Sequence, residues 1–298
     1  MSVLSLGSWR TYERLPRDDA LAVMVAAREA GITFLDDARY DDETGTAPIP
    51  TGWSEVLFGE LFRSAGWQRD EVVVSNKLWW EFWPEQPARE ELDGSLGRMQ
   101  LDHVDLIYAT TLPDGLDVAR AVEEVAGLIE TGRARAWGFT NWPAAQMAEA
   151  VEVASAAGVP GPCAAQLPYS LVRRGWVEDP AMDAVLAGGE VGLVASYALA
   201  GGTLTGKYLR GEPGRASAST DPMSEAGRAA AVELTSLADE WDVEPAQLAL
   251  AFALDHPCLA SLLFGATSPA QLATNVAAVE VHRALDPSQR ERLRRVGA

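Results

Sequence analysis

Three side chains in the first third of the chain combine the groups needed to protonate a carbonyl oxygen. Asp36 and Tyr40 follow the apolar run at 34–35, and Lys77 ends a second apolar run at 72–76. Short apolar runs that end in ionisable groups are typical of barrel strands that deliver side chains into a pocket. The lysine cation would lower the pKa of the phenol and the aspartate would hold the lysine. We therefore expect the phenol to act as a general acid.

Eight apolar runs of strand length alternate with stretches of helical spacing along the 298 residues. This alternation predicts an α/β fold, a (β/α)8 TIM barrel in which residues 1–298 form a single domain and function lies at the C-terminal ends of the strands. A doubly wound open sheet is the alternative. The expected strands lie near 3–7, 32–36, 71–76, 103–109, 133–138, 163–167, 191–195 and 259–264.

The composition excludes several classes of partner. Lys and Arg number 24 against 43 Asp and Glu, a formal charge of −19 that repels nucleic acid and anionic lipid. Cys163 and Cys258 fall on strands that are not neighbours in a closed barrel, so we expect no disulfide. Neither a signal peptide nor a transmembrane run is evident, and we expect a cytoplasmic protein.

Further segments repeat, in order, the motifs of one known family. With the Asp36–Tyr40 and Lys77 segments, the chain resembles the aldo-keto reductases over nearly its whole length. The resemblance implies reduction of an aldehyde or ketone by NADPH, with an Asp, Tyr, Lys and His tetrad. The matching segments are Gly138-Phe139-Thr140-Asn141-Trp142, Gln166-Leu167-Pro168-Tyr169, Ser196-Tyr197-Ala198-Leu199-Ala200-Gly201-Gly202, Leu204-Thr205-Gly206-Lys207-Tyr208, and Gly265-Ala266-Thr267-Ser268-Pro269 with Gln271 and Asn275.

Two departures from the family tetrad bear on activity. The family spaces its first motif Asp-Thr-Ala-x-x-Tyr, whereas here Tyr40 comes one residue early and strict counting from Asp36 lands on Asp41. The place of the family's His is taken by Thr110, whose hydroxyl can orient a carbonyl but carries no charge. We therefore expect a catalytic set of Asp36, Tyr40, Lys77 and Thr110, with narrow substrate range or weak turnover.

The family positions that bind the nucleotide are better preserved. Thr140, Asn141 and Gln166 match residues that hydrogen-bond the nicotinamide carboxamide, although polar residues at strand exits also serve as caps. The family's Tyr-Ser pair is reversed to Ser196-Tyr197, which displaces the stacking aromatic by one position. Phosphates should lie at the glycine-rich turn and the start of the last barrel helix. The other expected contacts are Ser8, Trp9, Leu199, Gly201, Lys207, Gly265, Thr267, Gln271 and Asn275.

The cofactor is expected to be NADPH on family grounds. NADH stays open, because Thr267, Ser268 and Gln271 offer only neutral donors to a 2′-phosphate.

Aromatic and acidic loop residues complete the expected site. Trp79, Trp80 and Trp142 follow strands and should line a pocket for a small carbonyl substrate. The acidic residues Asp37, Asp41, Asp42 and Glu43 lack a His or Cys, so we expect a solvated loop and no metal site. The connection at 209–222 resembles a flexible flap.

Two other functions remain open. One is an NADPH-binding sensor or regulatory subunit on the same barrel, which the altered tetrad favours. The other is an isomerase or aldolase that uses Lys77 as a Schiff-base amine, which leaves Thr140, Asn141 and Gln166 unexplained. We expect a monomer or weak homo-oligomer.

Overall fold

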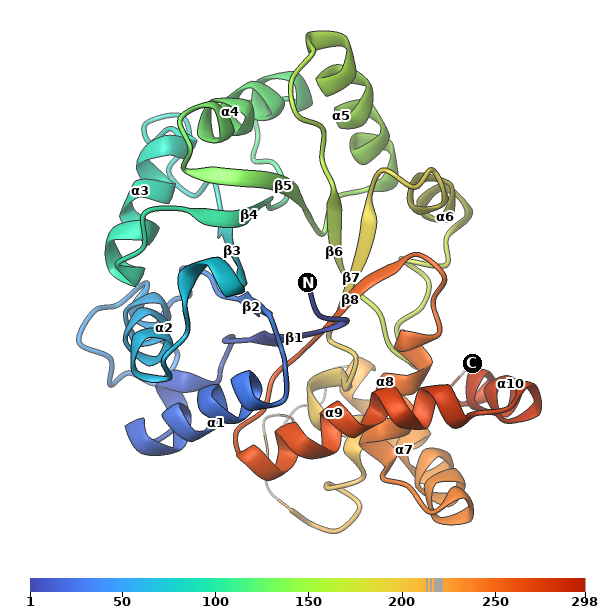
Figure 1. Cartoon of the computed structure of the whole chain (residues 1–298). Coiled ribbons are helices and arrows are strands. Elements are labelled where there is room, and N and C mark those ends of the chain that lie inside the picture. The colour runs from blue at the N-terminus through green and yellow to red at the C-terminus, as the bar shows by residue number, and fades with distance from the viewer. Residues whose placement is uncertain (213, 215, 217–221, 298) are drawn as a thin grey trace.

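Eight parallel strands form a closed barrel in the order β1 to β8 (Figure 1). The computed structural model describes residues 1–212, 214, 216 and 222–297. Each strand pairs with the next in sequence, and β8 pairs with β1. The predicted barrel is confirmed, and the open sheet is excluded. The strands are β1 Leu4–Gly7, β2 Phe34–Asp36, β3 Val73–Leu78, β4 Val104–Ala109, β5 Ala134–Thr140, β6 Ala164–Pro168, β7 Gly192–Ser196 and β8 Leu259–Phe264.

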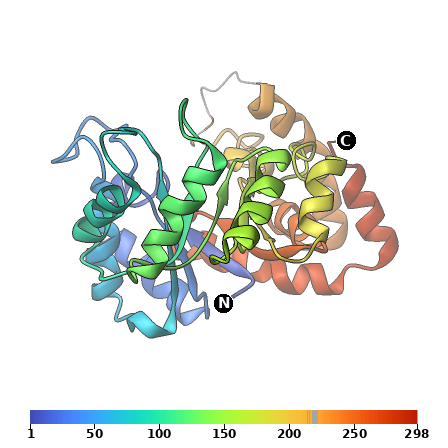
Figure 2. The ribbon, with the colours of Figure 1, turned by 90° about the horizontal axis from the view of Figure 1, so that it is seen from above.

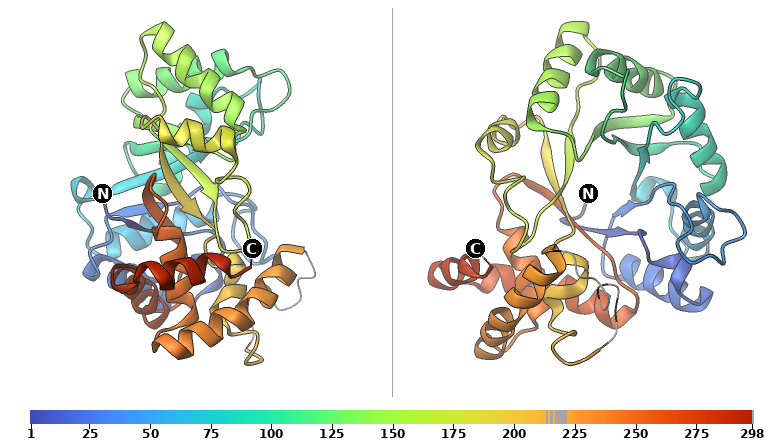
Figure 3. Two further views of the ribbon diagram at one scale, coloured as in Figure 1. Left: turned by 90° about the vertical axis from the view of Figure 1, so that its right-hand side faces the viewer. Right: turned by 180° about the vertical axis from the view of Figure 1, so that it is seen from behind.

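Helices surround the barrel, and helices from opposite ends of the chain complete the ring. Helix α9 contacts α1, and Figures 1 and 3 show the two side by side. The α-helices are α1 Arg17–Glu29, α2 Trp53–Ser64, α3 Ala88–Met99, α4 Val118–Glu130, α5 Ala144–Ala157, α6 Pro180–Ala187, α7 Pro222–Trp241, α8 Pro245–Leu254, α9 Pro269–Ala284 and α10 Pro287–Arg295. Short 3₁₀ helices are η1 Tyr12–Arg14, η2 Arg69–Glu71 and η3 Ala200–Thr205.

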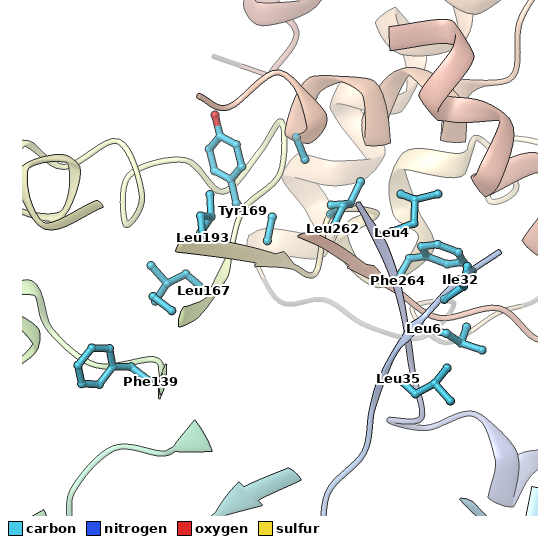
Figure 4. Close-up of a cluster of buried hydrophobic side chains, with 14 of the residues drawn as sticks. Leu4, Leu6, Ile32, Leu35, Phe139, Leu167, Tyr169, Leu193, Leu262 and Phe264 are labelled. Atoms are coloured by element: carbon cyan, nitrogen blue, oxygen red, sulfur yellow. The ribbon is translucent and has the colours of Figure 1, made fainter. Parts of the chain in front are cut away.

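Alternation along the strands divides the apolar side chains between two cores. A large cluster fills the layer between strands and helices, and Figure 4 shows part of it, including Leu6, Leu35 and Phe264. A small separate cluster contains Phe34 and Tyr108. Because successive side chains of a strand point to opposite faces, Phe34 and Asp36 share the barrel interior while Leu35 faces the helices. The strand pattern thus sends Asp36 inward.

The strand exits open at one end of the barrel. In Figure 2 the N-terminus lies at one end, and the light-blue segment that follows β2 projects at the opposite end. Strand β5 runs two residues beyond its predicted end, so Thr140 is its last residue. The predicted flap at 209–222 lies partly outside the described residues, because 213, 215 and 217–221 are not among them.

The described residues also bear on two expectations from the sequence, which concern a disulfide and a membrane-spanning segment. Cys163 and Cys258 are both free thiols. Within these residues, no helix is long and apolar enough to cross a bilayer.

Candidate active site

Lys77 is the centre of a buried polar cluster at the exits of β2 and β3. Its Nζ lies 2.7 Å from Asp36 Oδ2 and 3.3 Å from the Tyr40 hydroxyl. The lysine side chain is only 5% exposed and the aspartate 3%. Burial alone would lower the pKa of Lys77, but the charge of Asp36 and the hydrogen bonds to Asp36 and Tyr40 raise it above its ordinary value. The amine is therefore a cation at neutral pH.

Asp36 is fixed from two further strands. Its Oδ1 accepts hydrogen bonds from Ser75 Oγ at 2.6 Å and from Gln166 Nε2 at 3.1 Å. Ser75 lies two residues before Lys77 on the same inward face of β3, so the pattern of that strand could have identified it. With its other oxygen bonded to Lys77, the carboxylate is a fixed anchor for the amine.

Tyr40 reaches the cluster despite the shortened motif. Its ring is partly buried and meets Trp79 edge to face, with ring centroids 6.0 Å apart. Burial raises the pKa of Tyr40 above its ordinary value, and the positive charge of Lys77 opposes that rise without cancelling it. The sequence prediction had the right sign for the lysine but omitted the larger effect of burial. The phenol therefore keeps its proton at neutral pH and can donate it.

Thr110 is close to the site, but its one hydroxyl proton is in use. The Thr110 Oγ1 donates to the backbone oxygen of Leu78 at 2.7 Å. The Thr110 backbone oxygen in turn accepts from Trp142 Nε1 at 2.7 Å. A hydroxyl has a single donor, so Thr110 would have to leave Leu78 before it could donate to a substrate carbonyl.

Two buried carboxylates on the outer helices hold β3 and the segment after it. Glu55 on α2 accepts from Asn76 Nδ2 at 2.8 Å, next to Lys77. Glu91 on α3 accepts from the backbone N–H groups of Trp79 at 2.7 Å and Trp80 at 3.1 Å. Sequence reasoning missed both residues, because each lies on a helix far from the strand motif.

A cavity of about 430 Å³ is lined in part by Tyr40. Of the three tryptophans predicted to line a pocket, Trp79 lines this one. Trp80 is buried against Trp83, and Trp142 is buried against Phe139, so neither borders the cavity. The lining residues are Trp9, Arg10, Glu13, Arg39, Tyr40, Asp41, Glu43, Trp79 and Glu81.

The candidate nicotinamide site contains an unsatisfied polar atom. Thr140 is 8% exposed, and its Oγ1 is buried without a hydrogen-bond partner in the part of the chain described. Asn141 follows it with a positive φ of 61°, which turns the chain out of β5. Gln166 already donates to Asp36. Because a buried hydroxyl is normally paired, the residues fit a bound carboxamide at Thr140.

In the part of the chain that the structure describes, Lys207 lies over a glycine turn at the candidate phosphate site. Gly201 and Gly202 both have positive φ, and a Cβ on Gly202 would lie 3.3 Å from Lys207 Nζ. Tyr197, just beyond the end of β7 at Ser196, also has a positive φ, and its hydroxyl lies over Gly201. A lysine cation beside two glycines, whose backbone N–H groups are not covered by a side chain, fits a phosphate.

In the second predicted phosphate site, at the start of α9, the polar groups are bonded to one another. The backbone N–H and the Oγ1 of Thr267 each donate to Gln271 Oε1 at 3.0 Å. Ser268 caps α9 by accepting from the Gln271 N–H, and Asn275 is buried on that helix. Gly265 is exposed and lies between β8 and the cap. Thr267 and Gln271 would therefore have to exchange partners to bind a phosphate.

The prediction of a solvated acidic loop is wrong for Asp37. Its side chain is fully buried, and its Oδ1 accepts from Ser8 Oγ, one of the predicted cofactor contacts. Burial raises the pKa of Asp37 well above its ordinary value, and the charge of Glu55 adds to the rise. Side chains alternate between the two faces only within a strand, and Asp37 lies just beyond the end of β2. The strand pattern therefore did not indicate that this side chain is buried. The described residues contain no cluster of His, Cys, Asp and Glu suited to a metal ion.

Comparison with known proteins decides the family. The profile described as "Aldo/keto reductase family" matches residues 3–298. The chain belongs to this family. As an aldo/keto reductase family member it is an oxidoreductase by kind, with the barrel and the clustered Asp, Tyr and Lys described above.

Two similar proteins are named as potassium channel subunits. A protein of Oryza sativa subsp. japonica, "Probable voltage-gated potassium channel subunit beta", is 32% identical over 304 residues, which cover 96% of this chain and 90% of the relative. A protein of Arabidopsis thaliana with the same name is 28% identical over 313 residues, covering 99% and 93%. The similarity therefore extends over almost the full length of this family member.

Proposed function

We propose that this protein reduces an aldehyde or ketone to an alcohol, with NADPH as the hydride donor. One observation carries the proposal: the amine of Lys77 lies within hydrogen-bonding reach of both Asp36 and Tyr40 at the mouth of the barrel. A phenol, a buried cation and an anchoring carboxylate form a set that can deliver a proton to a carbonyl oxygen.

The residues have separate roles in this mechanism. A bound nicotinamide nucleotide would supply the hydride. Tyr40 would donate its proton to the carbonyl oxygen, which gains negative charge as the carbon is reduced. Lys77 would stabilise the phenolate that remains, since an ammonium 3.3 Å from the oxygen favours its charged form. Asp36 would keep the amine in place.

Other residues would hold the nucleotide. Thr140 and Asn141 would bind the carboxamide, Tyr197 would lie against the nucleotide, and Lys207 would attract a phosphate. Gln166 would orient Asp36 as well as the carboxamide, since its Nε2 is bonded to that carboxylate. We propose NADPH over NADH, and a titration decides between them.

A Schiff-base enzyme is the weaker interpretation. Lys77 is ion-paired with Asp36 at 2.7 Å, and its pKa is raised, so the amine is protonated at neutral pH. An amine must lose its proton before it attacks a carbonyl.

The test combines nucleotide binding with turnover. NADPH and NADH are titrated by stopped-flow fluorescence, and NADPH oxidation is then followed with aromatic aldehydes and keto sugars. Tyr40→Phe should lower turnover about 10²–10⁴-fold, because it removes the proton donor, and should leave nucleotide affinity unchanged. Tyr169→Phe is the matched control, because the Tyr169 hydroxyl donates to Glu178 and does not border the cavity. Equal turnover by both variants would remove Tyr40 from the mechanism.

A regulatory NADPH-binding subunit is the second candidate. It is favoured by the name of the two relatives and by Thr110, whose hydroxyl is bonded to Leu78. Tight NADPH binding with no oxidation across the whole carbonyl panel would support this function and contradict the reductase proposal.

A further inference from the structure

Charged side chains at the rim of the cavity are linked in ion pairs. Glu43 lies 2.5 Å from Arg10 and 2.9 Å from Arg14, which also lies 3.3 Å from Glu13. On the other side, Arg39 after β2 pairs with Glu81 after β3. The arginines near the cavity are therefore already occupied by carboxylates of the protein.

The carboxylates outnumber the arginines. The lining contains Arg10 and Arg39 but four carboxylates, which are Glu13, Asp41, Glu43 and Glu81. Adding Arg14 from just outside the lining still leaves three cations against four anions. The surplus residue is Asp41, which is exposed and has no ion-pair or side-chain hydrogen-bond partner among the residues that the structure describes.

The rest of the lining suits a flat organic group. Trp9, Tyr40 and Trp79 provide aromatic surface, and aromatic faces attract organic cations as well as apolar rings. Tyr40 and Asp41 both line this cavity, and Asp41 directly follows the proposed proton donor in the sequence. A substrate in the cavity can therefore contact both side chains, with its carbonyl at Tyr40 and its far end near Asp41.

We propose that this cavity selects aromatic carbonyl compounds that carry a cationic amino or quaternary ammonium group at the end remote from the carbonyl, and that Asp41 determines this specificity. The inference rests on the proposed reductase function, which makes the cavity a substrate site. The formal charge of −19 acts in the same direction, because it raises the local concentration of cations and lowers that of anions.

Three benzaldehydes of similar shape separate charge from size. The para substituents are trimethylammoniomethyl, its uncharged neopentyl isostere, and carboxymethyl, each with a methylene that insulates the ring. At low ionic strength the order of kcat/KM should be cation, neutral, anion, with about a tenfold preference for the cation over the neutral compound. Asp41→Asn should remove most of this preference, so that kcat/KM for the cation falls toward that for the neutral compound. Asp114→Asn is the matched control, an exposed carboxylate after β4 that does not border the cavity.

A binding measurement separates failure of this inference from failure of the reductase proposal. Isothermal titration calorimetry with benzyltrimethylammonium and with phenylacetate needs no turnover. Tighter binding of the cation, lost in Asp41→Asn and kept in Asp114→Asn, supports the inference even if no aldehyde is reduced. Turnover of all three aldehydes at equal kcat/KM, or equal binding of the two ions, overturns the inference and leaves the reductase proposal standing.

Discussion

Lys77→Met is the substitution that tests the proposed chemistry most directly. Methionine nearly fills the volume of the lysine side chain, so the change removes a charge without leaving a large cavity. It deprives Tyr40 of the cation 3.3 Å from its oxygen and deprives Asp36 of its only ion-pair partner in the described chain. We expect turnover to fall about 10²–10⁴-fold, the range typical of a lost general-acid function.

The same substitution has a stability cost that follows from burial. Asp36 is 3% exposed, and removing one partner of a buried pair costs about 3–5 kcal/mol. Ser75 and Gln166 still donate to Asp36, which places the expected cost near the lower limit, about 3 kcal/mol. For a chain of this length that corresponds to a decrease in Tm of about 5 °C.

A double variant separates the two effects. Asp36→Asn combined with Lys77→Met removes both charges, so most of the lost stability should return while turnover does not. Thermal unfolding, nucleotide affinity and kcat are measured for the wild type, both single variants and the double variant. Turnover of Lys77→Met within a factor of about ten of the wild type would refute the role of the lysine. Recovery of turnover in the double variant would show that its loss was due to folding.

Two further predictions concern buried polar groups. Thr140→Val should weaken NADPH binding about tenfold and leave the stability of the nucleotide-free protein unchanged or slightly higher, because the buried hydroxyl has no partner in the described chain; unchanged affinity would exclude Thr140 from the nicotinamide site. The raised pKa of Asp37 means that the folded protein binds the proton of this carboxyl group more tightly than the unfolded chain does. The contribution of Asp37 to the free energy of unfolding is therefore complete below about pH 3.9, the pKa in the unfolded chain, and decreases as the pH rises toward the pKa in the folded protein. Asp37→Asn should therefore raise Tm at pH 7 and have little effect on Tm near pH 4. Scanning calorimetry at both pH values measures this, and a lower Tm of the variant at pH 7 would contradict the prediction.

The fold and the central cluster could be predicted from local patterns. The eight strands fall at the eight short apolar runs of the sequence, and this signal depends only on neighbouring residues. Asp36 and Lys77 lie at strand ends on the inward face, so a closed barrel necessarily brings them toward the same axis. For the same reason Ser75 was accessible to prediction.

The remaining features depend on contacts between distant segments. Gln166 bonds to Asp36 across 130 positions of sequence, and Thr110 donates to a backbone oxygen of the neighbouring strand exit. Neither partner is indicated by residue type or spacing. Asp37 looks like a loop residue by composition, and only the packing of Ser8 against it reveals its burial. Sequence therefore indicated which groups were present but not how their hydrogen bonds are distributed.

Glu91 holds the backbone of the segment after β3, whereas other side chains of that segment face the cavity. One carboxylate on the outer side of the barrel holds two successive backbone N–H groups, at Trp79 and Trp80, so the path of that loop is fixed from behind. The side chains that face the cavity, among them Trp79 and Glu81, take no part in these two bonds, which join Glu91 to backbone atoms. Descendants of this chain could exchange those side chains for others and acquire new substrates, while the chemical centre at Lys77 kept its geometry.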